Sequence, residues 1–68
     1  MKIISMTITT THGGNENERG LFTIKYINNK GEEKKMEIED ISLSNVYSIC
    51  NLLEEVANID TPPINHYY

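Results

Sequence analysis

The sequence contains a single cysteine, Cys50, among 68 residues. A lone thiol excludes a disulfide within the chain, and one cysteine with two histidines, His12 and His66, does not supply the usual four ligands of a structural zinc site. We therefore expect no metal and no cofactor. A chain of this length forms one domain with a small core, which needs good packing or self-association to be stable.

Long apolar runs are also missing. The apolar residues of segment 1–11 alternate with serine and threonine, whereas a signal peptide needs a continuous apolar run. No stretch approaches the roughly 18 consecutive apolar residues of a membrane-spanning helix. Together with the single thiol, which is typical of a reducing compartment, this predicts a cytoplasmic protein.

The second half of the chain lacks basic residues. Residues 1–35 carry all six Lys and Arg against four Asp and Glu, a net charge of +2, whereas residues 36–68 carry six acids and no Lys or Arg, a net charge of −6. Phosphate contacts need Lys and Arg, so the second half is not expected to bind nucleic acid directly. An acidic surface can instead attract a basic partner.

Two hydrophobic periods divide the chain. Alternation with period two predicts strands at about 2–10, 21–27 and 32–39. Residues 44–57 place apolar side chains at steps of three and four, which is typical of an amphipathic helix. The remaining tail, 58–68, contains a Pro-Pro pair and is expected to be extended. The chain is therefore predicted to be a single α+β domain, a three-stranded antiparallel meander with one helix on one face (β-β-β-α).

The strand pattern assigns side chains to the two faces of this sheet. The helix is expected to cover Ile4, Met6, Ile8, Phe22, Ile24, Tyr26, Met36 and Ile38. The open face would then expose apolar residues, with Ile3 and Ile27 as neighbours. Such a patch needs a cover. The tail, through Ile64, Tyr67 and Tyr68, is one candidate, and a second copy or another protein is the other.

The predicted helix has recognisable ends. Ser42 or Ser44 is expected to cap its N-terminus, and Asn58 marks its end. Cys50 lies on its apolar stripe, where a buried and unreactive thiol is expected.

The segment THGGNENERG, residues 11–20, gathers glycines, carboxylates, a histidine and an arginine. A phosphate-binding loop usually opens a helix, but this segment precedes a predicted strand and lacks a Gly-Lys-Ser/Thr ending. Acid–base chemistry by His12 with Glu16 or Glu18 would need a concave, partly dry pocket, which a hairpin tip rarely offers. We predict a turn and no catalytic residues.

The sequence thus favours a non-enzymatic protein-binding module, an inhibitor or regulator that docks on a larger protein with a basic surface, such as a nucleic-acid-handling protein. The predicted contact residues are acidic, apolar or aromatic: Glu37, Glu39, Asp40, Glu54, Glu55, Ile3, Ile27, Tyr67 and Tyr68. The alternative is a small nucleic-acid-binding domain that uses Lys2, Lys25 and Lys35 on the open sheet face, although no exposed aromatic residue on that face is expected to stack with bases. A homodimer is compatible with either hypothesis.

The composition, rich in Asn, Lys, Ile and Glu, suggests an AT-rich bacterial or phage genome. In size and charge only, the chain is similar to small acidic inhibitors from phages and mobile elements, of which anti-CRISPR proteins are one group. That resemblance implies an inhibitor that occupies a nucleic-acid-handling protein of the host.

Overall fold

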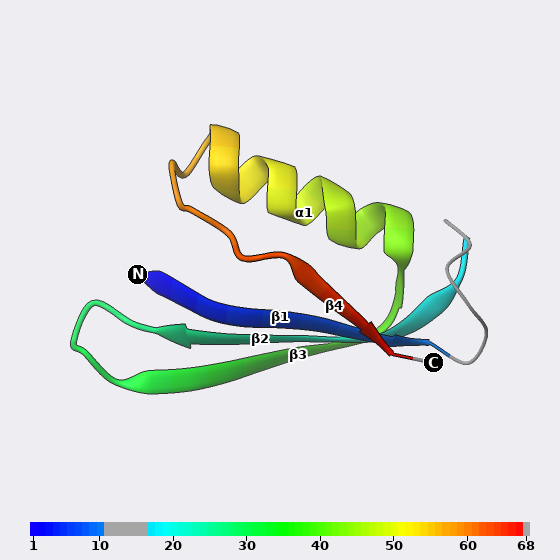
Figure 1. The fold of residues 1–68 in the computed structure, drawn as a ribbon, viewed down its shortest axis with the longest axis horizontal. Helices are drawn as coiled ribbons and strands as arrows, with labels where there is room; N and C mark the ends of the chain where they lie inside the picture. The colour runs from blue at the N-terminus through cyan, green and yellow to red at the C-terminus, as the bar shows by residue number, and fades with distance from the viewer. Residues whose placement is uncertain (11–16, 68) are drawn as a thin grey trace.

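The computed structural model describes residues 1–10 and 17–67. The element order is β1 (Lys2–Thr10), β2 (Arg19–Ile27), β3 (Glu33–Ser42), α1 (Leu43–Glu55) and β4 (Ile64–Tyr67). The strands form one four-stranded sheet in the order β3-β2-β1-β4, and α1 lies across one face of it (Figure 1). The α+β class and the β-β-β-α order are confirmed, but the sheet has four strands and is mixed.

The tail is extended at Ile64–Tyr67, as predicted, but it supplies a fourth strand, so the prediction of a three-stranded sheet is wrong. β4 pairs with β1 in parallel, with Met6 opposite Ile64 and Ile8 opposite His66. Because β1–β2 and β2–β3 are antiparallel, β3 and β4 run in the same direction, and parallel strands need a long crossover connection. The helix provides that crossover, carrying the chain from one edge of the sheet to the other (Figure 1).

A β-bulge in β1 reverses the predicted faces at its start. The register passes from Ile3 opposite Tyr26 to Ser5 opposite Lys25, which leaves Ile4 as the additional residue. Ile3 is therefore 6% exposed and belongs to the core, whereas Ile4 is 42% exposed. The prediction that Ile4 packs under the helix and Ile3 lies on the open face is wrong, because one inserted residue inverts a period-two pattern.

A second bulge lies near the end of β3. The register passes from Phe22 opposite Ile38 to Gly20 opposite Ile41, so β3 has one more residue than β2 in this interval. Asp40 has a φ of 52° there, a conformation that Asp and Asn adopt more readily than most residues. The bulge turns Ile41 into the core and lets β3 continue past its predicted end.

The core lies between α1 and the sheet. Its buried members are Ile3, Met6, Ile8, Phe22, Ile24, Ile41, Leu43, Val46 and Cys50. The predicted burial of Cys50 is confirmed, and its Sγ donates to the Met6 sulfur at 3.6 Å.

The ends of α1 follow the sequence signals. The Ser42 hydroxyl accepts a hydrogen bond from the Asn45 N–H at 3.2 Å, so Ser42 is the N-cap. At the other end Asn58 has a φ of 54°, and the next residue, Ile59, donates its N–H to the Leu53 carbonyl at 2.8 Å. This reversal directs the chain back toward β1, where β4 pairs.

Gly20, in β2, packs directly against the backbone of β1. A Cβ atom at this position would lie 2.0 Å from the Thr9 carbonyl oxygen, so no other residue fits without moving the backbone. The glycine at the end of segment 11–20 is thus explained by packing. His12 and Glu16, also in this segment, lie outside the described residues.

Candidate protein-contact surfaces

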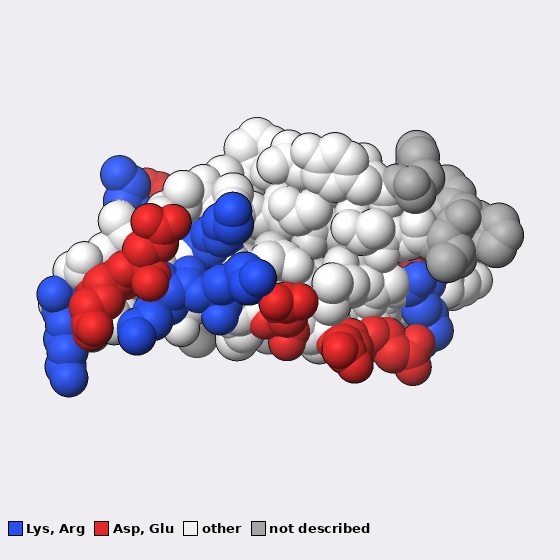
Figure 2. All heavy atoms as spheres, turned by 90° about the horizontal axis from the view of Figure 1, so that it is seen from below, with Lys and Arg blue, Asp and Glu red and all other residues white. Residues whose placement is uncertain are grey.

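The acidic group predicted on β3 is largely paired within the molecule. Asp40 accepts a hydrogen bond from Arg19 Nε through its Oδ1 at 2.8 Å, and its backbone carbonyl oxygen accepts another from the same guanidinium. Glu37 lies 3.1 Å from the ammonium group of Lys35. Glu39 is exposed beside them. Figure 2 shows acidic and basic side chains interleaved on the open face of the sheet, next to an uncharged area.

Two of the three lysines named by the alternative hypothesis lie opposite each other. The register places Lys25 directly opposite Lys35, and Lys2 lies opposite Ile27 on the same face. Two like charges directly opposite each other destabilise a strand pair. The nearby Glu37 offsets this repulsion, so the patch is not purely basic.

The apolar open-face patch that the sequence predicted does not form. Ile3 is buried under α1, and the strand neighbour of Ile27 is Lys2. Tyr67 is exposed at the far edge of the sheet, in β4, and Tyr68 lies outside the described residues. The tail therefore does not cover this face.

Exposed apolar side chains gather instead at the C-terminal end of α1. We call this surface the helix-end patch; it borders a shallow hollow of about 410 Å³ and comprises Ile49, Leu52, Leu53, Val56 and Ala57. Leu52 is 59% exposed and Val56 is 77% exposed, values that are unusual for large aliphatic residues.

The two predicted acidic residues of the helix adjoin this patch. Glu54 and Glu55 occupy the last turn of α1, which contains no basic residue. Glu54 also accepts a hydrogen bond from the Thr61 hydroxyl. The helix end therefore combines apolar area with two carboxylates.

A second apolar surface, the β3 groove, lies between α1 and the β3 edge. It has a volume of about 190 Å³ and is lined by Met1, Ile3, Ile24, Tyr26, Met36, Ile49 and Leu53. Met36 was predicted to lie under the helix, but it is 45% exposed, on a strand that forms an edge of the sheet. An apolar side chain is therefore exposed at the open edge of the sheet.

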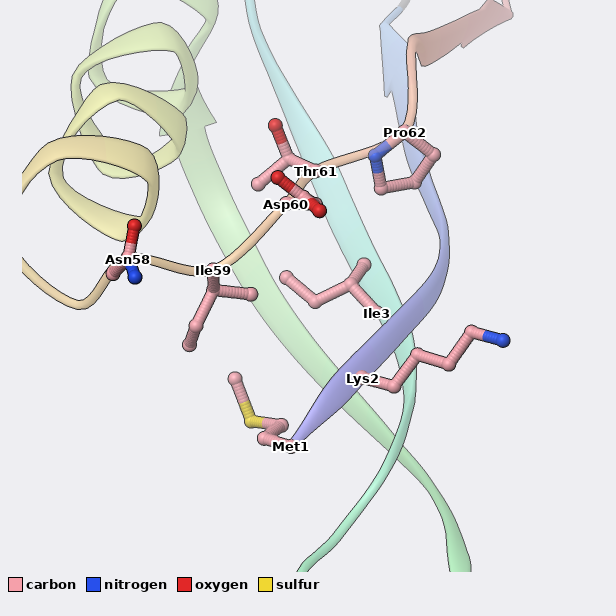
Figure 3. Close-up of a pocket in the computed structure, with 8 residues that line it drawn as sticks. All are labelled: Met1, Lys2, Ile3, Asn58, Ile59, Asp60, Thr61 and Pro62. Carbon is pink, nitrogen blue, oxygen red and sulfur yellow. The ribbon is translucent and has the colours of Figure 1, made fainter.

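A third hollow, of about 550 Å³, separates the start of β1 from the segment that leads to β4 (Figure 3). The side chains of Met1, Ile3 and Ile59 turn into it, whereas the Lys2 ammonium group points away. The N-terminal ammonium group donates to Asn29 Oδ1 at 3.0 Å, toward the β2–β3 turn. Charged groups do not converge in this hollow, so it does not resemble a site for an ionic ligand.

Cys50 and His66 are titratable residues that contact the interior of the fold. Burial, and secondly the charge of Glu54, raises the pKa of the Cys50 thiol. His66 Nε2 lies 3.0 Å from the buried Thr10 hydroxyl.

Over residues 1–10 and 17–67, no group of three or more His, Cys, Asp or Glu residues is placed to hold a metal ion. In the same part of the chain, no helix is long and apolar enough to cross a membrane.

No protein-family model, curated protein or solved structure matches this chain. Its function has to be inferred from its own surfaces. The two apolar surfaces were missed in the sequence because Met36 and Leu53 fall on the same periods as true core residues. The sequence feature that could have indicated the helix-end patch is the width of the apolar stripe on α1, because Leu52 and Val56 widen it beyond the residues that the core needs.

Proposed function

We propose that this protein is a non-enzymatic protein-binding module, a small acidic inhibitor or regulator that docks through the helix-end patch on a larger protein with a basic surface. The observation that carries this proposal is the exposure of Leu52 and Val56 beside Glu54 and Glu55. Protein interfaces commonly combine an apolar centre with a polar rim. The exposed aliphatic groups would supply the buried centre and the carboxylates would supply the rim.

The position of the two glutamates supports a basic partner. Anionic groups at the C-terminal end of a helix oppose the helix dipole, and each such contact is unfavourable by about 0.3–1 kcal/mol. Glu54 and Glu55 have this arrangement, and α1 carries no basic residue in its last turn to offset it. A Lys or Arg of a partner would relieve the repulsion at the same place.

The charge of the whole chain supports the same kind of partner. Residues 36–68 contribute six acids and no Lys or Arg, which gives a field that attracts basic surfaces over a distance. Surfaces that bind the phosphates of nucleic acids concentrate Lys and Arg. A nucleic-acid-handling protein, whose binding surface would be occupied, is the partner class that we propose.

The proposal is tested by comparing matched variants as bait in a cell extract. The tagged wild-type protein is expected to retain a specific partner, identified by mass spectrometry, which then binds the purified protein directly. Leu52→Ser with Val56→Ser should abolish retention, because it removes the apolar centre without touching the core. Tyr47→Ser, an exposed position on α1 outside the patch, is the matched control and should retain the partner. Equal retention by the double variant would refute the proposal.

The acidic rim is tested by association kinetics. Glu54→Gln with Glu55→Gln should slow association several-fold at low salt, and the difference should shrink as salt is raised, because rim charges act mainly on the on-rate. Glu32→Gln, an exposed acid in the β2–β3 turn outside the helix-end patch, should have little effect. Association that is insensitive to salt would contradict the electrostatic part of the proposal.

The alternative function, direct nucleic-acid binding, is favoured by one observation, the placement of Lys25 opposite Lys35. It predicts binding to a fluorescent single-stranded oligonucleotide at low salt that weakens when both lysines are replaced by glutamine. Binding that survives this double substitution, or no binding at low salt, would remove the alternative.

A further inference from the structure

The β3 strand forms one edge of the sheet, and within the described part of the chain no strand pairs with its outer side. We infer that a second copy of this chain binds there, pairing β3 with β3 in antiparallel orientation and closing the β3 groove. The two sheets would join into one continuous sheet about a two-fold axis perpendicular to it. This inference concerns a different partner and a different edge from the helix-end patch.

The backbone N–H and C=O groups of β3 that do not face β2 lie at positions suited to this pairing. The Asn28 N–H donates to the Glu32 carbonyl at 2.9 Å where the β2–β3 hairpin closes. Hydrogen-bonded and non-hydrogen-bonded pairs alternate along antiparallel strands, so positions 34, 36 and 38 direct their backbone groups toward β2. Positions 33, 35 and 37 direct theirs to the open edge.

The charge pattern of β3 allows opposite charges to meet across an antiparallel dimer. When the pairing is centred on Met36, Lys35 lies opposite Glu37 of the second copy, and the symmetry repeats this contact. Positions 35 and 37 are also the ones with free backbone groups, so each ion pair accompanies a hydrogen-bonded pair. Cross-strand pairs of opposite charge stabilise neighbouring strands of a sheet.

Neighbouring registers are less favourable. Centring on Lys35 would place this lysine opposite its own copy, and centring on Glu37 would do the same for that glutamate. The second bulge, at Asp40, also limits regular pairing to Glu33–Ile38. Charged edge strands usually discourage pairing with other chains, but an alternating pattern of this kind admits its own antiparallel copy.

The apolar groove gives the dimer its buried area. A two-fold axis perpendicular to the sheet keeps both helices on the same side, so the two β3 grooves meet. Met36 stands on the helix side of β3, beside Tyr26 and Leu53 in the groove lining. In this register Met36 forms a non-hydrogen-bonded pair with Met36 of the second copy, the closer kind of pair, with Cα atoms about 4.5 Å apart. Each small domain would thereby extend its core.

Three features oppose this association. Lys35 and Glu37 already form an ion pair within each chain, at 3.1 Å, which the cross-strand pairs would have to replace or share. Glu33 would approach Glu39 of the second copy at each end of the paired segment, where the bulge begins, and each chain carries a net charge of −4. We therefore expect a reversible dimer that dissociates on dilution.

The first test is sedimentation equilibrium of the full chain over a wide concentration range. The wild type should show a monomer–dimer equilibrium. Lys35→Glu or Glu37→Lys alone places like charges opposite each other twice and should raise the dimer dissociation constant by about tenfold or more. The two substitutions together should restore dimerisation, because the ion pairs re-form with exchanged partners. A wild type that stays monomeric at all concentrations, or a double variant that does not recover, would overturn the inference.

The second test fixes the register. In a Cys50→Ala background, Met36→Cys should form an intermolecular disulfide under mild oxidation, because two such cysteines lie within bonding distance across the axis. Lys34→Cys, on the same strand face but opposite Ile38 of the second copy, should not. Efficient cross-linking at Glu37→Cys instead of Met36→Cys would refute the register centred on Met36.

The proposed dimer and the proposed function can be refuted independently of each other. The Leu52→Ser and Val56→Ser double variant should keep the monomer–dimer equilibrium while losing the larger partner. A monomeric wild type that still binds a partner through Leu52 and Val56 would remove the dimer and leave the proposed function standing.

Discussion

The bulge at Ile4 leads to a sharp prediction for two adjacent isoleucines. Ile3 is 6% exposed and packs in the core, so Ile3→Ala should lower the free energy of unfolding by about 2–5 kcal/mol. Ile4 is 42% exposed, and Ile4→Ala should lower it by about 0.5–1 kcal/mol, chiefly through reduced strand propensity. At about 0.05–0.15 kcal/mol per residue, the whole domain has only about 3–10 kcal/mol. Ile3→Ala therefore removes a large share of the stability.

Urea unfolding followed by far-UV circular dichroism measures both effects, since the chain has no tryptophan. Should Ile3→Ala fail to fold, Ile3→Val gives a milder perturbation of about 0.5–1.5 kcal/mol. Ile4→Val is its matched control, with an expected change within about 0.5 kcal/mol. A larger loss at Ile4 than at Ile3 would show that β1 follows the uninterrupted alternation and has no bulge.

Three further predictions concern single positions. Gly20→Ala should destabilise the fold by about 1–3 kcal/mol, because the new Cβ would clash with the Thr9 carbonyl; an unchanged urea midpoint would contradict this close approach. Lys25→Glu should raise the free energy of unfolding by about 0.2–1 kcal/mol, because it replaces a like-charge pair with Lys35 by an attractive one; an unchanged urea midpoint would show that the two side chains do not interact. Because burial raises the pKa of the Cys50 thiol above its ordinary value of 9.0, the thiol's contribution to stability is complete below that pH and is lost as the pH rises toward the folded-state pKa. Cys50→Ala should lack this part of the alkaline decline, and equal declines in variant and wild type would refute it.

The local elements could be predicted from the sequence because their signals are local. Period-two alternation located β1, β2 and most of β3, and three- and four-residue steps located α1. The cap at Ser42 and the reversal at Asn58 each depend on one side chain and its immediate backbone. The burial of Cys50 followed from its place on the apolar stripe.

The contact surfaces could be predicted only in part. The sequence correctly indicated an acidic second half, but it gave no sign that Asp40 would be held by Arg19 and Glu37 by Lys35. Those pairs depend on strand register and on the bulge at Asp40. The apolar surfaces depend on how α1 packs on the sheet and on which strand forms its edge, which no local pattern encodes.

By itself the sequence determined the class of the fold, the order of its first four elements and the division of charge between its halves. These follow from residue spacing and composition, which act over a few residues. The tertiary structure alone decided that Ile3 is inside and Ile4 outside, that the tail joins β1 as β4, and that Met36 is left at an open edge. Each of these outcomes depends on pairing between segments far apart in the chain, where one inserted residue exchanges the two faces of a strand.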